Sequence, residues 1–138
     1  TYLSACIAME VAARGYEVRY YPAQALIDRF ERVRFNREAG ADDLTAMREI
    51  LSCDLLILDD LGAEFATAYS QSVLYQVIND RMTEGRATII STNLDLPALS
   101  KAYNERILSR LIGSYTMLGF VGRDIRQQKL ARRREGNT

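Results

Sequence analysis

The stretch that most constrains the fold of this chain runs from Leu55 to Gly62 and reads LLILDDLG. Four large apolar residues follow one another without a polar interruption, and two carboxylates come directly after them. An apolar run of this kind is typical of a strand that is buried on both faces, as in a parallel sheet covered by helices. We therefore expect an α/β fold with Asp59 and Asp60 at the carboxyl end of a central strand.

The two adjacent carboxylates are the first candidates for a functional site. Ligands of open α/β sheets bind at the carboxyl ends of the strands. One acid in that place can orient the water shell of Mg²⁺, and the next can activate a water that attacks a phosphate. This pattern is the Walker B motif. A buried strand whose acids merely cap the following turn, with Gly62 in that turn, has the same residues, so the motif alone leaves both interpretations open.

The composition excludes several classes of protein. A chain of 138 residues with 48% hydrophobic content forms one domain with a real core. Basic and acidic residues are equal at 18 each, which indicates no overall attraction to nucleic acid or membrane. The sequence contains neither a long apolar run nor a charged and apolar leader, so we expect a cytoplasmic protein without a membrane segment. With no histidine present, Cys6 and Cys53 are expected to be free thiols rather than zinc ligands.

Apolar spacing and turn residues predict alternating helices and strands, as expected for a parallel sheet. Ser70 and Asn104 are predicted to cap helices. The predicted strands, besides the central one, span residues 16–21, 87–93 and 115–121; the predicted helices lie at 1–14, 26–33, 44–51, 70–82 and 105–112, with a further helical segment opening at 95–97; and loops are expected at 36–43 and 63–69.

Thr1 is a further candidate because it opens the first helix without a cap. In the phosphate loop G-x-x-x-x-G-K-[ST], the hydroxyl of the last residue binds Mg²⁺ and the helix N-terminus faces the phosphates. Thr1 would be that residue if Gly-Lys preceded it; otherwise it is simply the first residue of a fragment. We expect the chain to lack the first strand and the phosphate loop of such a fold, and so to bind ATP poorly on its own.

Polar residues after the central strand add three candidates. Asn93 ends the next strand at the same edge, where its amide can bond a water or a phosphate, although asparagine is also common in turns. Arg106 and Arg110 lie four residues apart on one face of a predicted helix, with apolar residues on the other. Such a pair is either a solvated face or a means of reaching a phosphate on a neighbouring subunit.

The C-terminal residues form a basic tail that we separate from the folded core. The core is expected to span residues 1–122 and the tail residues 123–138, in which arginine and lysine outnumber acidic residues. The tail either follows the backbone of a nucleic acid or serves as a solubilising terminus.

Three motifs together resemble one protein family. LLILDDLGAE at 55–64, IISTN at 89–93 and ERILSRL at 105–111 occur in the order and spacing of the DnaC/DnaI/IstB family of AAA+ ATPases. This family comprises bacterial replicative helicase loaders and transposition helper ATPases, and the resemblance spans essentially the whole chain. It implies a P-loop NTPase (AAA+) three-layer sandwich with a parallel sheet.

The resemblance also implies roles for four residues near the sheet. Asp59 matches the Walker B aspartate that holds Mg²⁺ through its water shell. Asp60 occupies the place of the acid that polarises the attacking water; many AAA+ proteins carry glutamate there, and part of this family reads Asp-Asp. Asn93 matches the sensor 1 residue. Thr1 matches the hydroxyl residue of the phosphate loop.

The resemblance implies Mg-ATP as cofactor and a subunit interface as the place of hydrolysis. Arg110 matches the arginine finger that reaches the nucleotide of the next subunit, with Arg106 as an assistant or a second candidate, so a homo-oligomer is expected. The implied partners are the replicative DNA helicase and single-stranded DNA. Two alternatives stay open: a transposition helper that serves a transposase, and a binding fragment of the same fold without turnover.

Overall fold

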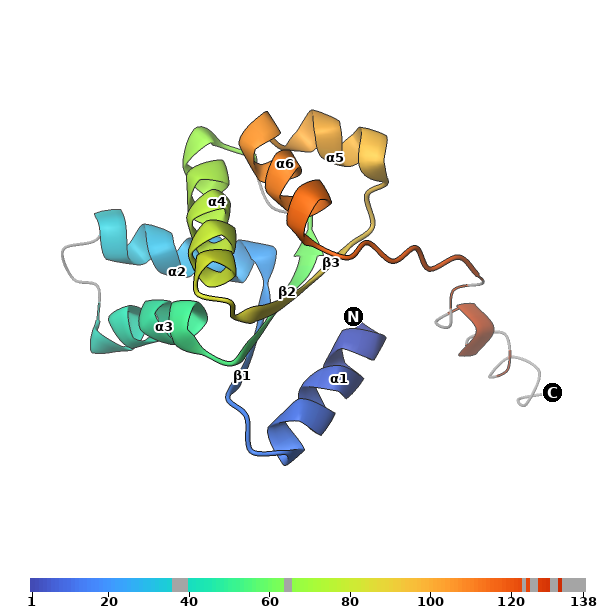
Figure 1. Cartoon of the computed structure of the whole chain (residues 1–138), viewed down its shortest axis with the longest axis horizontal. Helices are drawn as coiled ribbons and strands as arrows, with labels where there is room; N and C mark the ends of the chain where they lie inside the picture. Colours follow the sequence, from blue (N-terminus) through green and yellow to red (C-terminus); the bar gives the residue numbers. More distant parts are fainter. Residues whose placement is uncertain (36–39, 64–65, 123, 125–126, 130–131, 133–138) are drawn as a thin grey trace.

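Helices and strands alternate along the chain, and three strands form one parallel sheet in the order β1-β2-β3 (Figure 1). The computed structural model describes residues 1–35, 40–63, 66–122, 124, 127–129 and 132. The elements are α1 (Tyr2–Ala13), β1 (Val18–Pro22), α2 (Ala23–Phe35), α3 (Ala41–Ser52), β2 (Leu55–Leu61), α4 (Ala68–Thr83), β3 (Ala87–Thr92), α5 (Leu96–Ala102) and α6 (Glu105–Ser114). Among the described residues, no helix has the length and apolar character that crossing a bilayer requires.

Strand β2 is the centre of the sheet, as its apolar run predicts. It pairs in parallel with β1, where Val18 lies opposite Leu55, and with β3, where Ala87 lies opposite the same residue. The side chains of Leu56 and Leu58 are fully buried. Because β2 is hydrogen-bonded along both edges and covered on both faces, the face of the sheet on which each of its side chains lies is fixed.

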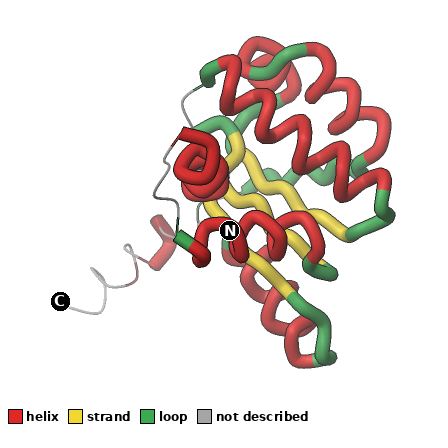
Figure 2. Tube along the Cα trace, turned by 90° about the vertical axis from the view of Figure 1, so that its left-hand side faces the viewer, coloured by secondary structure: helices red, strands yellow, loops and turns green. Residues whose placement is uncertain are grey.

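The sheet lies between two layers of helices (Figures 1 and 2). Helix α1 packs on β1 and β2 from one side, whereas α2 and α4 pack from the other. Leu56, Leu58 and Leu61 belong to the main core, together with apolar residues of α2, α4 and α6. Side chains alternate along a strand, so Ile57 and Asp59 face the α1 side.

A buried arginine of α4 forms hydrogen bonds with the end of α3 and the start of β3, at the amino ends of the strands. The Arg81 side chain of α4 is fully buried and donates hydrogen bonds to Ile50 O at 2.9 Å, Cys53 O at 3.0 Å, Ala87 O at 2.7 Å and Thr88 Oγ1 at 2.9 Å. Burial lowers its pKa. All of these acceptors are uncharged, so the cation is stabilised by oriented dipoles rather than by a carboxylate.

The strand expected at residues 115–121 is absent, so that prediction was wrong. The chain runs on from α6 without pairing to the sheet, and Met117, Leu118, Phe120 and Val121 are exposed. Apolar and aromatic composition favours an extended chain, but a strand forms only where a neighbouring edge supplies hydrogen bonds. The core boundary at residue 122 stays a prediction, since most of the tail lies outside the described residues.

Three helices start earlier than their apolar spacing suggests, the first being α2, which begins at Ala23. Helix α3 begins at Ala41, within the expected loop 36–43, whose residues 36–39 lie outside the described chain. Asp43 in its first turn accepts hydrogen bonds from Arg29 and Arg32 of α2 at 2.9 and 3.2 Å. Helix α4 is capped by Thr67, not Ser70, because the two side chains bond each other's backbone N–H groups in a capping box.

Replacing Arg81 with leucine should destabilise the fold strongly. The change removes the Arg81 donor from three carbonyl groups, two of them in fully buried hydrogen bonds, and a buried group that loses its partner costs about 1–3 kcal/mol. We therefore expect a loss of about 3 kcal/mol or more in the free energy of unfolding, measured by urea denaturation.

Arg14→Ala is the matched control for this experiment. Arg14 pairs with Glu10 on the exposed face of α1, and such pairs contribute less than about 0.5 kcal/mol. Equal stability losses for the two variants would contradict the role assigned to Arg81.

Candidate active site

The predicted site residues Thr1 and Asp59 come together at the carboxyl ends of the strands. The Thr1 hydroxyl donates to both carboxylate oxygens of Asp59, at 3.2 and 3.3 Å. The hydroxyl groups of Tyr20 in β1 and Ser91 in β3 also donate to this carboxylate. Asp59 is only 7% exposed. Three hydroxyl groups from three elements thus fix the orientation of one buried acid.

The register of the sheet explains why these side chains meet. Tyr20 lies opposite Ile57, which is two residues before Asp59 in β2 and so on the same face. Ile89 lies opposite Ile57 on the other side, and Ser91 is two residues further along β3. The start of α1 covers this face of the sheet, which brings Thr1 to the same point.

The hydrogen bonds decide the charge of Asp59. Burial alone would raise its pKa, but the hydroxyl groups of Ser91, Tyr20 and Thr1 bond the ionised form and the Thr1 ammonium group lies 3.9 Å from it, so the pKa is held below its ordinary value. Burial and the bond to this carboxylate raise the pKa of Tyr20 to about 12. Tyr20 therefore remains a donor, and Asp59 remains an anion, throughout the physiological range.

The donor set at this point fits Mg²⁺. This cation keeps several waters and is held by one or two carboxylates together with substrate phosphates. Asp59 offers an ionised carboxylate with the Thr1 hydroxyl beside it. The described residues contain no group of three acidic, histidine or cysteine side chains that could enclose a metal. A cation here would depend on phosphate oxygens as its further ligands.

Asp60 differs from Asp59 in its exposure and in its backbone conformation. Its φ is +58°, in the left-handed region, and the pairing of β2 with β3 is irregular between Leu58 and Leu61. The Asp60 N–H donates to Ser91 Oγ at 3.3 Å, and the residue is exposed. Its carboxylate is therefore available to a water in front of the strand end.

The other predicted residues make no contact with this acid pair. Asn93 is exposed just after β3, at the same edge, and within the described residues no hydrogen bond joins it to Asp59 or Asp60. Arg106 and Arg110 lie on α6, and the side chain of Arg106 stacks on the Tyr75 ring of α4. The two arginines are thus not part of the acid site within one chain.

Sequence reasoning missed Tyr20 and Ser91. Aromatic and hydroxyl residues are common in strands, so neither stands out by type. The signal that identifies them is strand parity: once Asp59 is placed, the residues that share its face on the two neighbouring strands follow from the register.

An aromatic cluster with a guanidinium group was also missed. Phe35 ends α2 and Tyr69 lies in the first turn of α4; their ring centroids are 5.2 Å apart in an edge-to-face arrangement. The Arg34 guanidinium lies 5.2 Å from the Phe35 ring centroid and 4.8 Å from that of Tyr69. Phe35 is 67% exposed. A π surface backed by a cation is therefore open to solvent.

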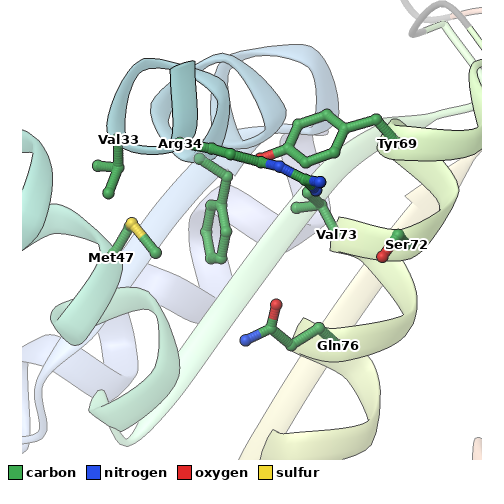
Figure 3. A pocket seen from close by; sticks show the side chains of 8 residues that line it. Val33, Arg34, Met47, Tyr69, Ser72, Val73 and Gln76 are labelled. Carbon is green, nitrogen blue, oxygen red and sulfur yellow. The ribbon is translucent and has the colours of Figure 1, made fainter. Parts of the chain in front are cut away.

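We call Arg34, Phe35 and Tyr69 the aromatic cluster. A small pocket adjoins it. Figure 3 shows the Arg34 side chain extending alongside the Tyr69 ring at the pocket. The cavity measures about 190 Å³. It lies between α2, α3 and α4 and is lined by Phe30, Val33, Arg34, Met47, Tyr69, Ser72, Val73 and Gln76.

Removing the Ser91 hydroxyl should raise the pKa of Asp59. The folded-state pKa is below the unfolded value, so Asp59 contributes stability above the unfolded pKa, and this is lost as pH falls through the folded pKa. In Ser91→Ala one of the hydrogen bonds that counter the effect of burial on the pKa of Asp59 is lost. We therefore expect the Asp59 carboxyl to titrate at higher pH, as measured by ¹³C NMR.

Ser100→Ala should leave that titration unchanged, since the Ser100 hydroxyl donates to the backbone of its own helix α5 and, among the described residues, does not bond Asp59. A pKa for Asp59 that stays the same in Ser91→Ala would contradict the assigned hydrogen bond.

Comparison with known proteins adds independent information. Residues 1–129 match the family described as IstB-like ATP binding protein. The replicative helicase loader DnaC of Escherichia coli K12 is 25% identical over 114 residues, covering 80% of this chain and 44% of DnaC. The chain thus spans less than half the length of this curated relative.

Solved structures agree on the fold. The crystal structure of the DnaC helicase loader superposes with a TM-score of 0.72 at 21% identity, covering 84% of this chain and 68% of that one. The replication initiator DnaA bound to AMPPCP and single-stranded DNA superposes with a TM-score of 0.63 at 21% identity, over 77% and 32% of the two chains. The fold is therefore that of AAA+ P-loop proteins, as predicted, and the chain belongs to the IstB-like ATP-binding protein family.

Proposed function

We propose that the protein carrying this chain hydrolyses ATP with Mg²⁺ at the interface between subunits, and uses the nucleotide to control its grip on single-stranded DNA and on a replicative helicase. The observation that carries this proposal is the hydrogen-bonded Asp59 with Thr1 at the sheet edge, in a chain of an ATP-binding family. Bound Mg-ATP supplies the reactive phosphate and the cation that offsets its charge.

The residues of the chain then take separate roles. Asp59, held anionic by three hydroxyl groups, bonds waters of the cation. Asp60 faces solvent and accepts a proton from the attacking water. Asn93, at the same edge, orients that water. Arg110 from a neighbouring subunit stabilises the charge on the transferred phosphate, with Arg106 beside it.

Asp60→Asn and Arg110→Ala should each lower kcat by about 100-fold or more, because one removes the proton acceptor and the other the cation of the transition state. Mixing the two inactive variants should restore part of the activity, since a hybrid interface combines the intact acid of one subunit with the intact arginine of the other. DNA-stimulated phosphate release, assayed with the full-length protein, measures both the loss in each variant and the recovery in the mixture.

Arg48→Ala serves as the control, because Arg48 is an exposed arginine on another helix, α3. Full activity of Arg110→Ala would overturn the arginine assignment. A wild-type protein that never hydrolyses ATP would overturn the enzyme proposal and favour a binding fragment without turnover.

The aromatic cluster is the surface that best supports binding of single-stranded DNA. Unpaired bases stack on exposed aromatic rings, and arginine adds a cation for the backbone. Phe35 and Tyr69 present ring surface beside the Arg34 guanidinium. This local cation matters because the chain as a whole has a net charge of zero. DnaA, which shares this fold, was solved with single-stranded DNA.

Tyr69→Ala should weaken binding of a fluorescent oligo(dT) about tenfold, since one stacked base contributes about 1–3 kcal/mol. Arg34→Gln should reduce the slope of log K against log salt by about 0.7, the value for one phosphate contact to a single strand. Fluorescence anisotropy at several salt concentrations measures both effects.

Tyr16→Ala is the control, because Tyr16 is 57% exposed but has no aromatic neighbour within the described residues. Equal losses for Tyr16→Ala and Tyr69→Ala would contradict stacking at the aromatic cluster.

The client protein is the least constrained part of the proposal. The similarity to DnaC favours a replicative helicase, and the IstB-like family leaves a transposase as the second candidate. Pull-downs with each purified client separate the two: retention of the transposase alone would replace helicase loading by transposition help.

A further inference from the structure

Tyr75 on α4 contacts the two arginines that α6 presents. The Arg106 Cζ atom lies 4.4 Å from the centroid of the Tyr75 ring. The guanidinium groups of Arg110 and then Arg106 lower the pKa of Tyr75. The half-buried Tyr75 ring therefore packs against Arg106, which shares its helix face with Arg110.

The two arginines lack a counter-charge. Within the described residues, neither Arg106 nor Arg110 forms an ion pair with a carboxylate, whereas Arg19, Arg29 and Arg86 all do. Like charges four residues apart on a helix repel each other. Two guanidinium groups held together without an anion form a ready receptor for phosphate oxygens, which they bind in pairs of hydrogen bonds.

Helix α4 also fixes the position of α6. The Asn104 side chain caps α6 by accepting from the Ile107 N–H at 3.1 Å, and the Asn104 N–H donates to Gln71 Oε1 of α4 at 2.8 Å. Ile107 and Leu111 are buried in the core on the opposite side of α6. Gln71 and Tyr75 lie one turn apart on α4, so the same helix face holds both the start of α6 and its arginines.

We propose that Tyr75 is a positioning residue whose ring holds Arg106 and so keeps the face of α6 that carries Arg106 and Arg110 turned toward the nucleotide phosphates of a neighbouring subunit. This inference rests on the proposed ATPase function. The stacking energy of a cation on an aromatic ring makes Arg106 the fixed partner. Arg110, which is half-buried one turn further along α6, is the group that turns to the phosphate.

Tyr75→Leu should lower kcat about 10- to 100-fold with KM for ATP unchanged, because a misplaced catalytic group loses rate rather than binding. Tyr75→Phe keeps the ring and should restore most of the rate. Tyr16→Leu, which removes an exposed tyrosine elsewhere, should leave both constants unchanged.

Mixing experiments separate positioning from a loss of structure. Tyr75→Leu mixed with Asp60→Asn should recover activity, because the second variant donates intact arginines to the intact acid site of the first. Tyr75→Leu mixed with Arg110→Ala should not recover, since both variants are defective on the same side of the interface. A protein that is merely unfolded would recover with neither partner.

Three results would overturn the inference: wild-type rates for Tyr75→Leu, a raised KM at unchanged kcat, or failure to complement Asp60→Asn. If instead Asp60→Asn and Arg110→Ala fail to complement each other, or the wild type does not hydrolyse ATP, the proposed function falls and this inference falls with it.

Discussion

The parallel pairing of β2 along both of its edges is the constraint on which the site depends. A central strand that is hydrogen-bonded on two sides has no freedom to slip, because a shift by one residue would turn its buried leucines to the wrong face. That register places Asp59 between Tyr20 and Ser91. The orientation of the acid is therefore a property of the sheet and does not require a ligand to create it.

Uncharged groups control charge at two places in this fold. Hydroxyl groups keep Asp59 ionised at the top of the sheet, and carbonyl groups together with the Thr88 hydroxyl stabilise Arg81 below it. Asp59 also lies 3.9 Å from the Thr1 ammonium group, but among the described residues neither place contains an arginine–carboxylate pair, whose desolvation often costs as much as its attraction returns. At the acid this choice has a chemical meaning, since a carboxylate already paired with arginine would have less charge left for a metal.

The parts of the fold that follow from local pattern could be predicted. The apolar run ending in two acids located the central strand and placed Asp59 at its carboxyl end, whereas the contact of Thr1 with Asp59 depends on how α1 packs on the sheet. The prediction at 115–121 was wrong because β propensity does not tell whether a segment pairs with a strand: β3 lies at an edge of the sheet, and these residues do not pair with it. Phe35 and Tyr69 were missed because they meet only through the packing of α2 against α4, which no short stretch of sequence encodes.

The left-handed backbone of Asp60 limits what evolution can place there. Among residues other than glycine, aspartate and asparagine adopt a positive φ most readily, and of these two only aspartate carries the acid that the proposed mechanism uses. Glutamate would bring the same charge with a longer reach but would enter this conformation less easily. The Asp-Asp form of the motif in this chain thus matches its own backbone: the turn after β2 selects the shorter acid, and a lineage that exchanged it for glutamate would have to rebuild the turn as well.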